Sequence, residues 1–238
     1  MKTDITTLLG IAFFTMIPFL SGCGSSDMTR REMEIVLGNG VKLGLVQIPN
    51  GLWISKYEIT QGQWKAVMGE NPSVIKADRF PVENVSWNDC QEFLKKVNAL
   101  QIVKESGLTF RLPTETEWRY ACRGSDSNGQ GSYCLLADGT EISIETLGQA
   151  AWFDLDGINH GDGYEKIVGQ KTPNAFGLYD MHGNVWELTS RTNADLCIIC
   201  GGCFSNAPSA CSIGSDESVR WILFDHKGRD IGFRIVGN

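Results

Sequence analysis

The 238-residue sequence has no excess of positive charge and contains no block of five or six like charges. Its 21 Lys and Arg residues are outnumbered by 28 Asp and Glu residues, which gives a formal net charge of −7. A nucleic acid or another polyanion held by general electrostatics is therefore not expected as a partner.

Histidine is scarce, and the G-x-S-x-G sequence of many serine hydrolases is absent. The three histidines, His160, His182 and His226, lie apart in glycine-containing segments without an i, i+4 pair. We therefore expect them to form local hydrogen bonds and not to ligate a metal. Glycine, by contrast, is abundant: 27 residues predict a loop-rich fold.

The N-terminal apolar run is too short for a permanent membrane-spanning helix. It covers residues 8–20, only 13 positions, and contains Gly10 and Pro18, whereas a spanning helix needs about 20 apolar residues. With Lys2 in front of it, the run is typical of an export signal.

The signal ends in Leu20-Ser21-Gly22-Cys23, which resembles the lipobox of bacterial lipoproteins. The resemblance implies that Cys23 is lipidated and becomes the first residue of an exported, membrane-anchored protein in the periplasm or on the outer surface. A plain secretory signal with an incidental cysteine is the alternative. The expected organisation is a signal peptide over 1–22, the lipidated cysteine and a tether over 23–44, and one domain over 45–238.

Seven cysteines remain after Cys23, an odd number that allows at most three disulfides in an oxidising compartment. Three of them, Cys197, Cys200 and Cys203, have C-x2-C-x2-C spacing, as in some iron–sulfur and zinc sites. The isoleucines between the first two favour a strand, however, and residues three apart on a strand point to opposite faces. We therefore expect packing, free thiols or a disulfide here in preference to a metal cluster.

Regular secondary structure is predicted mainly for the first half of the chain. A strand from residue 53 precedes three capped helices, over about 60–69, 86–100 and 114–124, with a short strand at 109–112. The helical faces point Cys90 and Cys122 at the core. After residue 124, short strands at 196–204, 219–224 and 231–235 are joined by long loops, and Arg234 is expected to be buried beside a carboxylate.

Several short strings resemble, in order, the formylglycine-generating enzyme family, also called the sulfatase-modifying-factor domain. They are Lys56-Tyr57-Glu58-Ile59-Thr60, Pro81-Val82-Glu83-Asn84-Val85-Ser86-Trp87, Arg111-Leu112-Pro113-Thr114-Glu115, Asn174-Ala175-Phe176-Gly177-Leu178-Tyr179-Asp180-Met181, Gly183-Asn184-Val185-Trp186-Glu187, Gly201-Gly202 and Gly232-Phe233-Arg234. The resemblance covers about residues 45–238. It implies an irregular, loop-rich α+β fold related to C-type lectins.

Enzymes of this family oxidise a sulfatase cysteine to formylglycine with molecular oxygen and copper, which is held by two cysteines five residues apart. In this sequence Cys211 matches the second of these cysteines, Asn206 stands at the position of the first, and Cys203 replaces a nearby serine. Because thiolates are the soft ligands that Cu(I) prefers, an amide at one position should weaken copper binding. Cys203 could substitute, although its spacing from Cys211 is eight residues.

Two functions are consistent with this pattern. In the first, the protein lacks full oxidase activity and acts as a binding or envelope-assembly module for a protein or glycan. In the second, it is a copper- and oxygen-dependent oxidase with Cys211 as an essential ligand.

The resemblance also implies a calcium site. Its positions here are Asp180, Gly183, Val185 and Glu187, which supply side-chain and backbone oxygens of the kind calcium prefers. Four ligands are fewer than calcium takes, so water or another loop would complete the shell. In the alternative, the two carboxylates hydrogen-bond loop amides without an ion.

Overall fold

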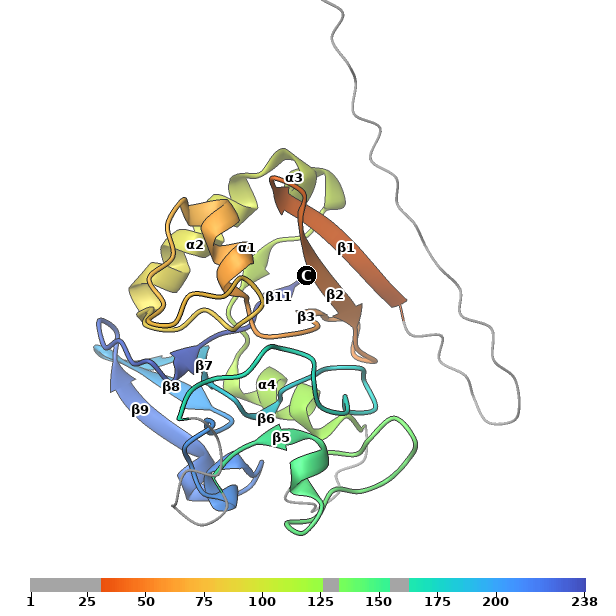
Figure 1. Ribbon diagram of the computed structural model, residues 1–238. Coiled ribbons are helices and arrows are strands. Elements are labelled where there is room, and N and C mark those ends of the chain that lie inside the picture. Colours follow the sequence, from red (N-terminus) through yellow and green to blue (C-terminus); the bar gives the residue numbers. More distant parts are fainter. Residues whose placement is uncertain (1–30, 126–132, 155–162) are drawn as a thin grey trace, which may run out of the picture.

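The computed structural model describes residues 31–125, 133–154 and 163–238 (Figure 1). The expected signal peptide, Cys23 and His160 lie outside the described residues. The described chain contains a five-stranded sheet in the order β1-β2-β3-β11-β4, a four-stranded sheet in the order β10-β7-β8-β9 and a two-stranded sheet of β5 and β6. The expected loop-rich α+β class is confirmed.

A β-hairpin opens the first sheet. Strands β1 (Arg31–Gly38) and β2 (Val41–Gln47) pair antiparallel around Asn39 and Gly40, whose φ angles are 50° and 77°. Positive φ at both turn residues gives the twist that two-residue hairpins require, and Asn-Gly is a favoured pair for it. Residues 31–44, expected to belong to the tether, form most of this hairpin, and its Asn-Gly turn lies between alternating apolar residues.

The last residues of the chain lie inside this sheet. Strand β11 (Val236–Gly237) pairs with both β3 (Trp53–Ser55) and β4 (Phe110–Arg111). Of the expected strand at 231–235, only β10 (Ile231–Gly232) is a strand, and it pairs with β7 in the other sheet. The C-terminal segment thus joins the two sheets.

The three expected helices are present, each with its capping box: α1 (Gln61–Met68), α2 (Trp87–Ala99) and α4 (Glu115–Arg123). A short helix that was not expected, α3 (Gln101–Ser106), follows α2 after the extended residue Leu100. Cys90 on α2 and Cys122 on α4 are fully buried, as the helical faces predict.

The second sheet consists of β7 (Trp186–Asn193), β8 (Leu196–Cys200), β9 (Val219–Leu223) and β10. The small sheet pairs β5 (Ala151–Trp152) with β6 (His182–Gly183). Three 3₁₀ segments complete the elements: η1 (Leu147–Gln149), η2 (Pro208–Cys211) and η3 (Asp216–Ser218).

Aromatic packing fills the core between the helices and the sheets. Trp64 of α1 stacks on Phe93 of α2 at 5.2 Å, and Phe233 meets both rings edge-on at 6.0 and 5.4 Å. Such pairs add to the free energy gained by burying the rings. No helix in the described part of the chain is both long and apolar enough to cross a membrane.

Candidate functional site

The loop after β8 brings the candidate copper residues together. The chain leaves the strand through Gly201 and Gly202, whose φ angles of 99° and 73° favour glycine. A Cβ atom on Gly202 would lie 2.7 Å from the Sγ atom of Cys211. This glycine lets Cys203, immediately after it, approach Cys211 at the end of η2.

The side chain of Asn206 closes this loop. Its Oδ1 atom accepts hydrogen bonds from the backbone N–H of Cys203 at 3.0 Å and from the Cys203 thiol at 3.1 Å. The backbone N–H of Asn206 in turn donates to the carbonyl of Cys203 at 3.0 Å. The amide oxygen is thus already used to hold the turn.

Both thiols of the loop are buried and disfavour ionisation. Burial raises the pKa of Cys203 to about 11 and raises that of Cys211 further, with the neighbouring Cys203 adding to the effect on Cys211. Both side chains are 0% exposed. At neutral pH and without a metal ion, the two sulfurs therefore favour the protonated form over the thiolate that attacks a substrate.

A buried histidine lies beside this loop, although only local hydrogen bonds were expected for it. His182 Nδ1 lies 2.6 Å from the carbonyl oxygen of Cys211, 29 residues further along the chain. Because a carbonyl only accepts, Nδ1 carries the hydrogen, and Nε2 faces Cys122 Sγ at 3.6 Å. Burial lowers the pKa of His182 to about 4, so the ring is neutral and not an effective partner for a thiolate.

The candidate calcium residues belong to a buried charged network. Arg234 donates from Nη2 to Glu187 Oε1 and from Nε to Glu187 Oε2, both at 2.6 Å, and Trp118 Nε1 also donates to Oε2 at 2.6 Å. Arg234 and Glu187 are 0% and 1% exposed. The expected burial of Arg234 beside a carboxylate is confirmed, and the partner is Glu187.

Two further carboxyl groups face the same arginine. Glu58 accepts from Asn184 Nδ2 at 2.6 Å and from the backbone N–H of Val185 at 3.2 Å, and burial raises its pKa well above the usual range. Asp180 accepts from the backbone N–H of Gly169 at 2.7 Å through Oδ2, while its Oδ1 is buried without a described partner. Burial raises the pKa of Asp180 to about 6.

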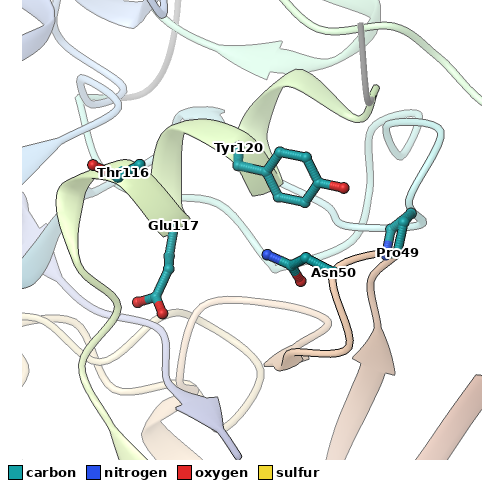
Figure 2. Close-up of a pocket in the computed structure, with 5 residues that line it drawn as sticks. All are labelled: Pro49, Asn50, Thr116, Glu117 and Tyr120. Carbon is teal, nitrogen blue, oxygen red and sulfur yellow. The ribbon is translucent and has the colours of Figure 1, made fainter.

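Two surface hollows are lined by other residues. The first, of about 430 Å³, lies between α4 and the loop joining β2 to β3 and contains Asn50, Glu117 and Tyr120 (Figure 2). The carboxylate of Glu117 in this hollow is paired with Arg111, which lowers the pKa of Glu117 to about 2. The second, of about 340 Å³, lies beside β9 and includes Trp221. Neither hollow is lined by the thiols of the Cys203–Cys211 loop.

The sulfatase-modifying factor enzyme 1-like domain, also described as FGE-sulfatase, matches residues 24–238. The chain belongs to this family. The match begins before residue 45 and includes the residues of the first hairpin.

Curated relatives within the family differ in function. The chain is 29% identical to the chaperone protein LppX of Paenibacillus barcinonensis, over 71% of this chain and 75% of that protein. It is 32% identical to the formylglycine-generating enzyme of Mus musculus, over 53% of this chain but only 31% of that enzyme. Among solved structures, Treponema denticola variable protein 1 superposes with a TM-score of 0.69 at 22% identity, covering 86% of this chain and 98% of that one.

The two residues that the resemblance places at the copper positions do not supply two thiols. Cys211 is a buried thiol, and Asn206, the other residue, has its side-chain oxygen bonded to Cys203. The residues present therefore do not fit a two-thiolate copper site of the family type.

Arg234 neutralises one of the two carboxylates in the calcium set. It holds Glu187, which leaves Asp180 Oδ1 as the buried side-chain oxygen of this set without a described partner. No group of three or more His, Cys, Asp or Glu side chains suited to a metal occurs among the residues that the structure describes. Calcium takes six to eight oxygens, so calcium binding here, which would also use the backbone oxygens of Gly183 and Val185, stays a prediction.

Proposed function

We propose that this family member is an exported, lipid-anchored protein that lacks full cysteine-oxidase activity and acts as a binding or envelope-assembly module. The observation that carries this proposal is the role of Asn206. Its side chain is an acceptor that shapes the Cys203 turn, and it stands where the oxidases of the family need a copper-binding thiol.

The burial of the remaining thiols supports the same proposal. Formylglycine formation needs metal-bound thiolates that a substrate can reach, and Cys203 and Cys211 are buried, which raises the pKa of both thiols. Neutral His182 cannot compensate by stabilising a thiolate at Cys122 or Cys211.

The lipid anchor and the binding role in this proposal are supported by different observations. The sequence Leu20-Ser21-Gly22-Cys23 supports lipidation and anchoring at a membrane. Similarity to a relative named as a chaperone over most of both chains supports a polypeptide partner. Neither role requires copper or calcium.

An oxidation assay separates the proposed role from the enzymatic alternative. The purified protein would be supplied with copper, oxygen and a peptide containing Cys-x-Pro-x-Arg, with an active formylglycine-generating enzyme as positive control. We expect no aldehyde product by mass spectrometry from either the wild type or Cys211→Ala. Conversion by the wild type that Cys211→Ala abolishes would overturn the proposal and establish Cys211 as an essential ligand.

A further inference from the structure

Two buried carboxyl groups outside the Arg234 network each have an oxygen without a described partner. Glu83 and Glu165 are 0% and 1% exposed. Glu83 Oε1 accepts a hydrogen bond from the backbone N–H of Val74, whereas Glu83 Oε2 and Glu165 Oε1 accept none in the part of the chain that the structure describes. A buried oxygen that loses its water without gaining a donor costs free energy, so both oxygens call for a further donor.

The loops that carry these two groups are packed against each other. The backbone N–H of Val168 donates to the carbonyl oxygen of Arg79 at 3.1 Å, and the rings of Phe80 and Tyr164 stack with their centres 6.2 Å apart. Tyr164 immediately precedes one of the two glutamates, and Phe80 lies three positions before the other. The contact between the loops is therefore formed beside the two carboxyl groups.

The charges that act on the pair come from both loops and from the C-terminal segment. Burial raises the pKa of both groups, and the charge of Glu165 raises that of Glu83 further. In the opposite direction, Arg229 lowers both pKa values, while Lys76 acts on Glu83 and Lys166 acts on Glu165. The two carboxyl groups thus interact with each other and share one arginine.

This arginine does not supply the missing donors. Arg229 Nη2 donates to the carbonyl oxygen of Gly163 at 3.3 Å, and neither of the two glutamate oxygens has a partner among the described residues. A metal ion fits poorly, because two carboxylates fall short of the three or more His, Cys, Asp or Glu side chains that would make a metal group, of which the described chain has none. A single proton satisfies both oxygens, since a protonated carboxyl group donates and a carboxylate accepts.

We infer that Glu83 and Glu165 share one proton, which Glu83 Oε2 donates to Glu165 Oε1, and that this hydrogen bond joins the two loops until rising pH removes the proton. The proton neutralises one of two neighbouring like charges, and a hydrogen bond from a carboxyl group to a carboxylate is of the strong, charge-assisted kind. Once the proton is lost, two carboxylates repel each other at the same contact.

The direction of the pH dependence follows from the folded and unfolded states. The pKa of Glu83 is raised from 4.5 to about 7 in the folded protein, so the folded state keeps its proton to higher pH than the unfolded chain does. The stability that the shared proton provides is complete below about pH 4.5 and is lost as pH rises through about 7. The contact between the loops is therefore expected to weaken above neutral pH.

Amide hydrogen exchange of the purified protein at pH 5.5 and pH 8, corrected for the intrinsic exchange rates, tests this inference. The segment 163–169 contains the Val168 N–H that bonds Arg79, and β2, which lies in the first sheet, is the internal reference. In the wild type we expect the protection of this segment relative to β2 to fall at least about tenfold between the two pH values, because a tenfold change corresponds to one pKa unit.

Two amide variants remove the titration and keep a donor. In Glu83→Gln and in Glu165→Gln the new amide N–H donates to the remaining carboxyl group at any pH, so the tenfold loss of protection should disappear in both. Glu70→Gln is the matched control, because Glu70 is exposed and lies at the start of the loop that contains Glu83. It should lose protection as the wild type does. Urea unfolding curves at both pH values show that each variant is folded.

Three outcomes would overturn the inference. Wild-type protection that does not change with pH would show that no proton joins the loops. A loss of protection in Glu165→Gln equal to that of the wild type would show that Glu83 responds to pH by its burial alone. Recovery of wild-type protection at pH 8 by millimolar calcium chloride, with the same recovery in Asp180→Asn, would place a metal ion and not a proton between the two carboxyl groups.

Discussion

At Arg234 a single guanidinium lies among several buried carboxyl groups. It forms a two-bond ion pair with Glu187, while burial keeps the pKa values of Glu58 and Asp180 raised. Buried charge without a partner is costly, so the surplus carboxyl groups are held partly as neutral acids. The protonation of this network therefore contributes to how stability depends on pH.

Glu83 provides a simpler case outside that network. Burial, reinforced by the nearby Glu165, raises its pKa from 4.5 to about 7, and its Oε2 is buried without a described partner. The unfolded chain releases this proton near pH 4.5 and the folded chain near pH 7, so the stability that the protonated group provides is lost as pH rises through this window.

We predict that Glu83→Gln becomes more stable relative to the wild type as pH rises from 5 to 8, by about 2 kcal/mol, because the amide cannot ionise. Urea unfolding at both pH values measures the difference. Glu70→Gln, at an exposed position, is the control and should show no such trend. A constant difference between Glu83→Gln and the wild type would contradict the raised pKa.

Some contacts of individual residues could not be predicted from the sequence. Alternation of apolar neighbours correctly predicted that Arg234 is buried beside a carboxylate. It did not identify Glu187, 47 residues away, because pairing at that distance depends on how β7 and the C-terminal segment meet. The family resemblance predicts a different role for Glu187, as a calcium ligand.

Among the elements, those defined by neighbouring residues were the most predictable. The capping boxes at Thr60, Ser86 and Thr114 are local hydrogen-bond patterns, and all three helices begin where they indicate. Of the strand predicted at 231–235, only residues 231–232 form a strand, β10, and the chain joins the other sheet from Val236 onward. At Gly232 the chain passes so close to Val82 that a Cβ atom would lie 2.6 Å from the Val82 carbonyl oxygen. No local pattern records such a contact.

The turn between β8 and the Cys203 loop should be intolerant of any side chain. We predict that Gly202→Ala destabilises the protein by about 2 kcal/mol more than Gly139→Ala does. Both glycines have positive φ, 73° and 86°, but only at Gly202 would the new Cβ meet other atoms, Cys211 Sγ at 2.7 Å and the Ala210 carbonyl oxygen at 2.9 Å.

Comparing the two alanine variants cancels the cost of the backbone conformation and leaves the contact. Chemical denaturation of both variants and the wild type provides the comparison. Equal losses of stability would show that Cys211 can move away from Gly202 without cost, and that the loop is less tightly packed than the structure indicates.

For the whole molecule, the distribution of cysteine is the most informative feature. The seven cysteines of the described chain are free and buried, with none more than 2% exposed. Burial raises their pKa values, to about 12 at Cys134 and about 11 at Cys197. The sequence left open whether they form disulfides, and the fold distributes them through its hydrophobic interior.

We predict that these seven thiols resist iodoacetamide in the native protein at pH 8, because alkylation needs an exposed thiolate. Mass spectrometry should show them labelled slowly in buffer and completely in guanidinium chloride. Rapid native labelling of Cys203 or Cys211 would instead indicate an accessible reactive site. A mass deficit of two hydrogens per pair in guanidinium would reveal disulfides.

Contacts between segments far apart in the sequence could not be predicted from local patterns. The meeting of His182 with Cys122 and with the Cys211 carbonyl joins β6, α4 and η2, and nothing in the sequence around His182 marks it. The exposed edge of β9 is similar: the strand was predicted, but its position at the end of a sheet follows only from the order of its neighbours.

The position of β11 between β3 and β4 bears on when the domain can form. Residues 236–237, near the end of the printed sequence, bridge two strands that come much earlier in the chain, so the five-stranded sheet has a gap until they arrive. A ribosome or a translocation channel that still holds these residues would keep the sheet incomplete. Loss of residues 236–238 should therefore be more damaging than their number suggests.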